Sequence, residues 1–341
     1  MTPFWRDKRV IVGGGCGFLG SYLVPRLAAA RVRVTVVDNL ENGERSVLDP
    51  VAGDITIVEA DLRDRQVCDE VLPGCELFIN LAAKASGIGF SRSHHGEMLV
   101  DNVLTGLVPL QAAARHSVPH VVTVSTSCVY PDDAPVPTPE LDALAGSPES
   151  VNEGYGWAKR VQELAAGYFT RELGMQVTIL RPFNMYGANY PWRSVEKAHV
   201  IPALVKRVLD GEDPLVVWGS GAQRRNFLHG SDAAEVILRV IERAPAEPVN
   251  IGYEEDTSIA ELVALICDVT GRHPTIEFDR GKPDGAARKS ADSTRLRALT
   301  DNYVPRVTLR QGIEEMMQWY EKTFGTAAVD ARASAAFKDS P

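Results

Sequence analysis

Strand-like apolar runs alternate with helical patterns through the first half of the chain. The runs are RVIVGG, VRVTVVD, ITIVEADL, LFINLAA, HVVTVSTS and VTILRP, and helical stretches lie near 18–30, 97–116 and 153–173. Apolar strands separated by amphipathic helices are typical of a parallel sheet that helices cover on both faces. The pattern therefore predicts an α/β fold with a doubly wound parallel sheet.

The alternation of strands and helices ends after RPFNMYG at residues 181–187, where loops become longer and richer in Pro, Gly and Trp. A chain of 341 residues is long enough for two lobes. We expect residues 1–181 to form the sheet domain, rejoined by about 230–253 through the strand-like PVNIG. Residues 182–229 and 254–325 would form a smaller C-terminal lobe. Residues 326–341 have little to bury and predict a disordered tail.

Composition excludes several classes of protein. The 36 Lys and Arg against 45 Asp and Glu leave no basic domain, so we expect no nucleic-acid partner. No apolar run reaches the ~18 residues that a membrane span needs. The charged start MTPFWRDKRV is unlike a signal peptide, and the five scattered cysteines show no metal-ligand spacing. These features predict a cytoplasmic protein without a metal site.

A glycine-rich stretch, VIVGGGCGFLGS, follows the first strand and opens the first helix. Gly14, Gly17 and Gly20 have the spacing that lets a dinucleotide pyrophosphate approach the backbone at a helix N-terminus. Asp38 ends the next strand, where a carboxylate accepts hydrogen bonds from the adenosine ribose and repels a 2′-phosphate. The stretch predicts a Rossmann-type domain that binds NAD in preference to NADP.

Neighbours of these motifs complete the predicted cofactor site. Asp61 follows the third strand and is either an adenine contact or a helix N-cap. The other residues that we expect against the cofactor adjoin the carboxyl ends of the strands or the glycine turn: Phe18, Leu19, Asn39, Leu62, Leu81, Ala82 and Ala83.

Tyr155 and Lys159 in NEGYGWAKR share one face of a helix, because they are four residues apart. An ammonium and a nicotinamide ring both favour phenolate, so we expect a lowered pKa for Tyr155. The phenolate could then take a proton from a substrate hydroxyl while hydride leaves for the cofactor. Thr126, at the end of the strand HVVTVSTS, would hold the same oxygen.

The chain resembles the extended short-chain dehydrogenases/reductases of the nucleotide-sugar epimerase/dehydratase family over residues 8–325. The matching stretches are GGGCGFLG, NLAAKASGIG, STSCVYP, NEGYGWAK, RPFNMYG, HVIPALV, GSGAQRRNFLH and FDRGKPDGAARK. The last four, with SCVYP, most resemble the GDP-sugar members, GDP-fucose synthases and GDP-mannose 3,5-epimerases. The resemblance implies a homodimer formed through the helices near 97–116 and 153–173.

Substrate-binding roles follow from the same resemblance. Arg225 would hold the diphosphate, with Asn184 beside it, although a turn-stabilising Asn is an equal alternative. Trp218, Lys282 and Arg288 would line the nucleotide pocket. Ser86, Gly87 and Val200 complete the predicted substrate contacts.

Residues that differ from the family motifs reduce the number of reactions that the resemblance allows. Dehydratases place Asp-Glu after the Thr, whereas this chain has Ser127 and Cys128, which argues against 4,6-dehydration. Lys197 resembles the catalytic Lys of the 3,5-epimerases and His199 resembles the acid of the GDP-fucose synthases. The leading hypothesis is an NAD-dependent GDP-hexose epimerase. The alternatives are an NADPH-dependent 4-keto-sugar epimerase/reductase, a UDP-sugar 4-epimerase and a cofactor-sensing regulator without enzymatic activity.

Cys128 is then either a packed core thiol or one member of an acid/base pair with Lys197 or His199. Two residues beyond Thr126 on an extended strand end, its side chain would face the same side as the hydroxyl. A thiolate is a competent base only if a nearby cation lowers its pKa. We expect Lys197, His199 and the nicotinamide ring to supply that charge.

Overall fold

The computed structural model describes residues 2–142, 144–190, 198–282 and 285–325. In this part of the chain the main element is a seven-stranded sheet of order β11-β6-β5-β4-β1-β2-β3, parallel throughout. Its strands are β1 (Arg9–Gly13), β2 (Arg33–Asp38), β3 (Ile55–Glu59), β4 (Leu77–Asn80), β5 (His120–Val124), β6 (Gln176–Pro182) and β11 (Val249–Ile251). The predicted Rossmann-like α/β fold is confirmed.

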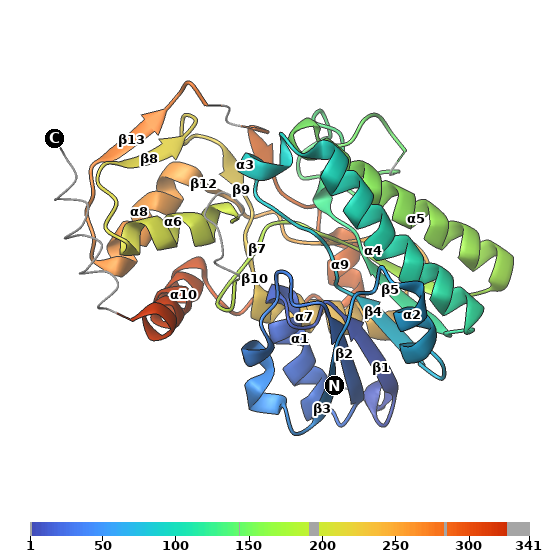
Figure 1. Ribbon diagram of the computed structural model, residues 1–341. Coiled ribbons are helices and arrows are strands. Elements are labelled where there is room, and N and C mark those ends of the chain that lie inside the picture. Colours follow the sequence, from blue (N-terminus) through green and yellow to red (C-terminus); the bar gives the residue numbers. More distant parts are fainter. Residues whose placement is uncertain (1, 143, 191–197, 283–284, 326–341) are drawn as a thin grey trace.

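Helices cover both faces of this sheet, as Figure 1 shows. One face carries α1 (Phe18–Ala29), α7 (Gly230–Arg243) and α9 (Thr294–Leu299), and the other α2 (Arg65–Val71), α4 (His95–Arg115) and α5 (Glu153–Leu173). Alternation along β1 explains the two layers, because Val10 and Val12 enter the core beneath α1 while Ile11 enters the opposite core.

A smaller lobe of helices and strands lies beside the sheet domain (Figure 1). It has its own apolar core. The lobe contains α6 (Val200–Leu209), α8 (Ile259–Thr270), α10 (Leu309–Phe324) and the parallel pair β8 (Leu215–Trp218) and β13 (Ile276–Asp279). Capping boxes at Ser258 and Thr308 start α8 and α10. The core between these three helices is apolar, as their periodic Leu, Val and Ile residues require.

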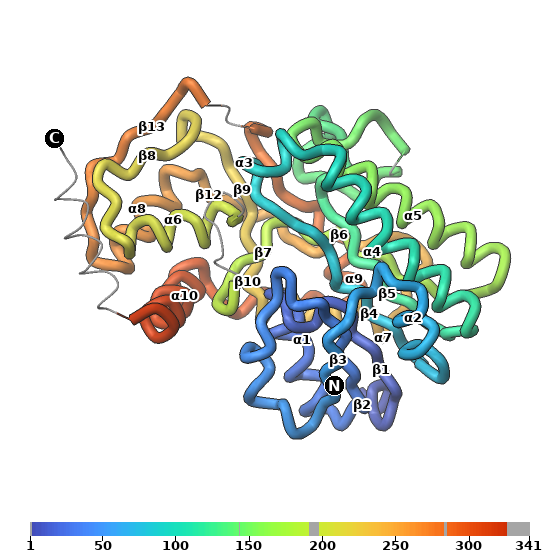
Figure 2. The backbone as a smooth tube through the Cα atoms, viewed as in Figure 1, coloured from blue at the N-terminus to red at the C-terminus, as the bar shows by residue number. Residues whose placement is uncertain are grey.

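Short strands and turns connect the two lobes. They are β7 (Met185–Tyr186), β9 (Arg224–Arg225), β10 (Leu228–His229), β12 (Thr257–Ser258) and β14 (Arg288–Lys289). Other short elements are the helix α3 (Ile88–Ser91) and the 3-10 turns Pro3–Trp5, Arg45–Val51, Ser127–Val129 and Ser150–Asn152. Figure 2 shows the chain passing between the lobes along β7 and β10. These crossings bring segments distant in sequence to one edge of the sheet.

The predicted lobe boundaries can be placed against this packing. Strand β11 pairs with β6, so the segment around 249–251 lies in the sheet. Helix α9, which the prediction assigned to the smaller lobe, packs against α7 and β11, and Leu296 belongs to the core beneath the sheet. The division into lobes stays a prediction, and its last segment, 326–341, lies outside the described residues. Among the helices within the described ranges, none combines the length and apolar character of a membrane span.

Candidate active site

A cavity of about 970 Å³ opens along the carboxyl edge of the sheet and extends under the smaller lobe. Ligand pockets occupy roughly 300–1,000 Å³, so this one is at the large end. The predicted residues that line it are Gly14, Gly17, Phe18, Leu19, Gly20, Asp38, Asn39, Asp61, Leu62, Leu81, Ala82, Ala83, Ser86, Gly87, Thr126, Cys128, Tyr155, Asn184, His199, Val200, Trp218 and Arg225. Parallel sheets bind ligands at this edge, outside the carboxyl ends of the strands.

The glycine turn is packed too closely for a side chain at two of its positions. Gly14 has φ +70°, and a Cβ there would lie 2.6 Å from the backbone of Ala82. A Cβ on Gly20 would lie 2.2 Å from the carbonyl oxygen of Gly15, so only glycine lets α1 approach the turn. Gly14, Gly17 and the N-terminus of α1 line the cavity, which is the arrangement that receives a pyrophosphate.

Two carboxylates flank this turn. Asp38 accepts hydrogen bonds from the backbone N–H groups of Cys16 and Leu40, both at 2.9 Å, and burial raises its pKa. Asp61 accepts from Asn39 at 3.1 Å and from the Arg63 guanidinium, which lowers its pKa to about 2. Both groups line the cavity, and their contacts with the ribose and adenine of a cofactor stay a prediction. Asp61 is not a helix N-cap, because Asp64 caps α2.

Tyr155 and Lys159 lie on one face of α5, as predicted, but their electrostatics differ from the expectation. The Lys159 Nζ donates to the carbonyl of Val124 at 2.8 Å and lies 5.7 Å from the centre of the Tyr155 ring. Burial lowers the pKa of Lys159 to about 8 and raises the pKa of Tyr155. The protein alone therefore does not lower the pKa of Tyr155 as expected, because burial and the neighbouring Cys128 both raise it.

Cys128 does not extend strand β5, which corrects the predicted geometry. The strand ends at Val124, and residues 127–129 form a 3-10 turn that Thr126 caps by accepting a hydrogen bond from the Cys128 N–H at 3.2 Å. The turn, and not strand alternation, brings Cys128 and Thr126 to the same cavity.

The cation beside the thiol is Lys289, which the sequence analysis missed. Its Nζ lies 3.8 Å from the Cys128 Sγ and 3.0 Å from an oxygen of Glu149. Burial raises the pKa of Cys128 to about 12 and Glu149 reinforces the rise, whereas Lys289 opposes it. The thiol therefore carries its proton at neutral pH, contrary to the expectation of a lowered pKa.

His199 also lines the cavity, at the N-terminus of α6. Burial and the nearby charge of Lys289 lower its pKa, so its imidazole is neutral at pH 7. Its predicted companion, Lys197, lies outside the described residues.

Strand alternation decides which basic side chains face the cavity. In the register of β9 with β14, Arg225 pairs with Lys289, and both line the cavity. Arg224 pairs with Arg288, and both form ion pairs with Asp256 outside it. The predicted role of Arg288 in the nucleotide pocket is therefore wrong, and its neighbour Lys289 occupies that side. The RK dipeptide in GAARKSAD was the available signal, since one of the two had to face inward.

The remaining predicted substrate residues are placed as follows. The Nδ2 of Asn184 is buried against the cavity without a hydrogen-bond partner among the described residues, which leaves it for a ligand. Trp218 lies at the cavity, with Arg92 5.4 Å and Lys282 5.5 Å from its ring centre. Lys282 therefore contacts Trp218 but does not itself line the cavity. No group of three His, Cys, Asp or Glu within the described ranges could hold a metal ion.

Comparisons with known proteins agree with this geometry. Residues 10–252 match the NAD dependent epimerase/dehydratase family. A putative GDP-L-fucose synthase 2 of Oryza sativa subsp. japonica is 36% identical over 245 residues, which is 70% of either chain. GDP-mannose 3,5-epimerase 1 of the same plant is 28% identical over 326 residues, 94% of this chain and 84% of the relative.

Among solved structures, UDP-glucose 4-epimerase of Thermotoga maritima, crystallised with UDP-glucose, superposes with a TM-score of 0.81 at 26% identity. The match covers 92% of this chain and 99% of that one. The relatives are nucleotide-sugar epimerases, reductases and related enzymes, and the cofactor turn and the Tyr155–Lys159 face are in place. The chain belongs to the NAD dependent epimerase/dehydratase family and is an enzyme of that family.

Proposed function

We propose that this protein is an NAD-dependent nucleotide-sugar epimerase that acts on a GDP-hexose. The observation that carries the proposal is the shared cavity of Tyr155, Cys128 and His199, which combines a group for C4 with two further proton-transfer groups. A simple 4-epimerase needs only the first. The Ser-Cys pair after Thr126, in place of the Asp-Glu of dehydratases, supports epimerisation over loss of water.

NAD held along the glycine turn and Asp38 would supply the hydride acceptor for C4 and, in its reduced form, the donor for the return step. Tyr155 removes the proton of the C4 hydroxyl, and Thr126 holds that oxygen. The resulting C4 ketone acidifies the hydrogens on C3 and C5. His199, neutral at pH 7, accepts one of these protons, and the Cys128 thiol delivers a proton to the same carbon from the opposite face. Inversion at C3, C5 or both follows.

The nucleotide half of the substrate would lie against Trp218, Arg225 and Asn184. A guanidinium suits a diphosphate bidentately, and the unpartnered Asn184 amide is a donor for the same oxygens. The similarity to GDP-L-fucose synthase and to GDP-mannose 3,5-epimerase supports a GDP-sugar. A UDP-sugar is the second candidate, favoured by the superposition on UDP-glucose 4-epimerase.

Deuterium exchange tests the reaction. The purified protein is incubated with GDP-, UDP- and dTDP-hexoses in deuterated water, and the label is mapped by NMR. We expect deuterium at C3 or C5 of a GDP-hexose without net consumption of cofactor. Unlabelled product inverted only at C4 of a UDP-sugar would replace the proposal with the 4-epimerase, and stoichiometric oxidation of NADPH would replace it with the epimerase/reductase.

Cofactor preference is tested separately, by titrating cofactor-free protein with both dinucleotides. Because Asp38 is buried at the ribose position, we propose that NAD binds about tenfold or more tightly than NADP, the effect of one hydrogen bond to a charged group. Equal or tighter binding of NADP would favour the reductase.

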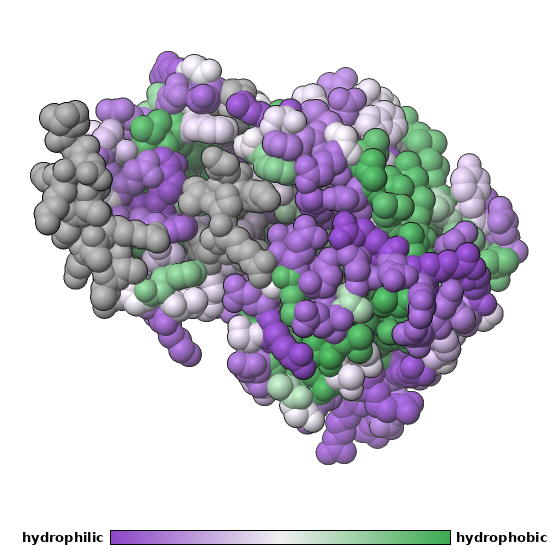
Figure 3. Space-filling model, in the orientation of Figure 1, coloured by the Kyte–Doolittle hydropathy of each residue, from purple (hydrophilic) through white to green (hydrophobic). Residues whose placement is uncertain are grey.

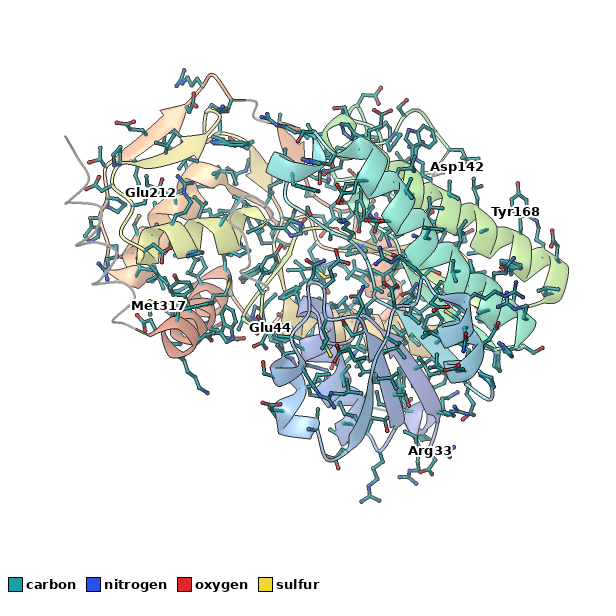
Figure 4. All side chains as sticks on the ribbon, in the orientation of Figure 1. Arg33, Glu44, Asp142, Tyr168, Glu212 and Met317 are labelled. Atoms are coloured by element: carbon teal, nitrogen blue, oxygen red, sulfur yellow. The ribbon has the colours of Figure 1, made fainter. Side chains whose placement is uncertain are left out.

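We also propose that the protein is a homodimer. Apolar side chains gather over α4 and α5 in Figure 3, and Figure 4 shows Tyr168 projecting outward from α5. Val100 and Leu104 on α4 are 57% and 43% exposed, and Tyr168 is 52% exposed. An apolar patch on a helix pair is suited to a second copy of the same pair. Leu104→Glu should convert the dimer to a monomer in sedimentation velocity.

A further inference from the structure

Glu149 and Lys289 form a buried ion pair in the corner of the cavity behind Cys128. The Lys289 Nζ is 3.0 Å from Glu149 and 3.8 Å from the Cys128 Sγ. The side chains of Lys289 and Glu149 are only 16% and 11% exposed, and both residues and Cys128 line the cavity. Burial of an ion pair costs desolvation free energy unless further hydrogen bonds stabilise the pair. A buried pair beside a thiol is therefore a candidate for a role in the chemistry of that thiol.

Three separate segments build this corner. Strand β14 presents Lys289, and the turn at 127–129 presents the thiol. Glu149 is tied to that turn, since its backbone N–H donates to the Cys128 carbonyl at 3.2 Å. Asn152 donates to the second carboxylate oxygen of Glu149 at 2.7 Å. The ammonium is therefore held at one place relative to the sulfur.

We propose that Lys289, held by Glu149, is a positioning residue that stabilises the thiolate of Cys128 when the sulfur has given its proton to the sugar. The inference rests on the proposed epimerase function and extends it, because the proposed reaction assigns no role to Glu149 or Lys289.

The proton balance is as follows. Cys128 begins as a thiol, and the S–H bond breaks as a C–H bond forms at the carbanionic carbon of the sugar. The negative charge moves from the sugar to sulfur, 3.8 Å from the Lys289 ammonium. Lys289 keeps its proton throughout, since Cys128 and Glu149 raise its pKa against the effect of burial. Solvent restores the thiol before the next cycle.

Glu149 and Tyr155 are the other titratable groups that interact with the Cys128 thiol. Glu149 is ionised, because Lys289 and its hydrogen bonds overcome burial and lower its pKa to about 2. Its negative charge disfavours the thiolate, and Lys289 favours it. A negative charge on the sulfur would also raise the pKa of Tyr155. The two members of the pair therefore have opposite effects on the ionisation of Cys128.

Alkylation of Cys128 measures that ionisation without substrate. Cys128 is the one cysteine of the five that is not buried, so iodoacetamide should label it selectively. Cys267, which is buried, should stay unlabelled in the same sample and so reports whether the fold is intact. The labelled peptides are quantified by mass spectrometry at pH 8 with NAD absent. Only the thiolate reacts, so the rate reports its fraction.

Lys289→Met should slow the labelling of Cys128 about tenfold or more, since a cation at this distance shifts a pKa by roughly 1–3 units. Lys289→Arg should restore most of the rate. Glu149→Gln should accelerate labelling, because it removes the opposing charge. Arg288→Met is the matched control, as that side chain is paired with Asp256 away from the cavity, and it should leave the rate unchanged.

A loosened fold would accelerate labelling in both variants, so opposite effects separate charge from disorder. An unchanged rate in Lys289→Met would overturn the proposal. If that variant does not fold, Glu149→Gln decides, provided that buried Cys267 stays unlabelled in it. An unchanged or slower rate of Cys128 labelling there overturns the proposal as well. Because alkylation requires neither substrate nor turnover, failure of this proposal leaves the epimerase standing, and a different reaction leaves the labelling result intact.

Discussion

The two halves of the cavity are built in different ways. The cofactor half is made by loops that directly follow β1, β2, β3 and β4, and its decisive features are backbone ones, such as the left-handed conformation of Gly14. The substrate half is made by side chains from the turn at 127–129, the N-terminus of α6 and strands β9 and β14. Its decisive features are charges brought together over long sequence distances.

This difference predicts which ligand a substitution in each half of the cavity should affect. A substitution in the cofactor half alters backbone geometry and should affect dinucleotide binding alone. A substitution in the substrate half alters charge and hydrogen bonding, and should affect the sugar and its nucleotide while NAD binding persists. The following predictions test that separation.

Tyr155→Phe, at the junction of the two halves, should have the largest effect. Removal of the proton acceptor should lower turnover ~10²–10⁴-fold, the range of general base catalysis. Thermal unfolding and NAD binding should stay close to wild type, because the ring remains in place. Near-normal turnover in the folded variant would remove Tyr155 from the proposed reaction.

Gly14→Ala should weaken NAD binding about tenfold or more. The φ of +70° costs an alanine about 1–2 kcal/mol, and the added Cβ meets the Ala82 backbone. Isothermal titration with NAD measures the effect. Gly53→Ala is the matched control, because nothing lies within 4 Å of a Cβ added there. Equal affinities for the two variants would contradict the assigned role of the turn.

Arg225→Ala should raise the KM for the nucleotide sugar about tenfold, since hydrogen bonds between charged groups contribute roughly 1.5–3 kcal/mol. Arg224→Ala provides the comparison, because the adjacent side chain points to Asp256. NAD affinity should be the same in both. A larger change in KM for Arg224→Ala would show that the assigned faces of β9 are reversed.

The pH dependence of deuterium incorporation should show the smallest of these effects. Burial and Lys289 lower the pKa of His199, so its neutral form persists below the ordinary value of ~6.5. Since the neutral imidazole accepts the proton, deuterium incorporation should fall only as pH drops through this lowered pKa. An acid limb with its midpoint above ~6.5 would mean that His199 is not the base.

Much of the cofactor half follows from the sequence because its determinants are local. The alternation of strands and helices predicts the parallel sheet, and the glycine spacing predicts the turn whose close contacts the structure contains. Tyr155 and Lys159 share a face by helical periodicity alone. In each case residues within one or two consecutive elements contain the whole signal.

Other features depended on the tertiary structure. Lys289 lies 161 residues from Cys128, and it reaches the thiol because β14 pairs with β9 in a register that turns Lys289 and Arg225 inward and Arg288 outward. A one-residue change of register would exchange these faces, and no local pattern in a two-residue strand determines it. The protonation of Cys128 is likewise set by burial and by neighbours from three segments. The sequence alone determined the sheet, the cofactor turn and the Tyr155 helix, whereas long-range strand pairing and desolvation decided which charges face the cavity.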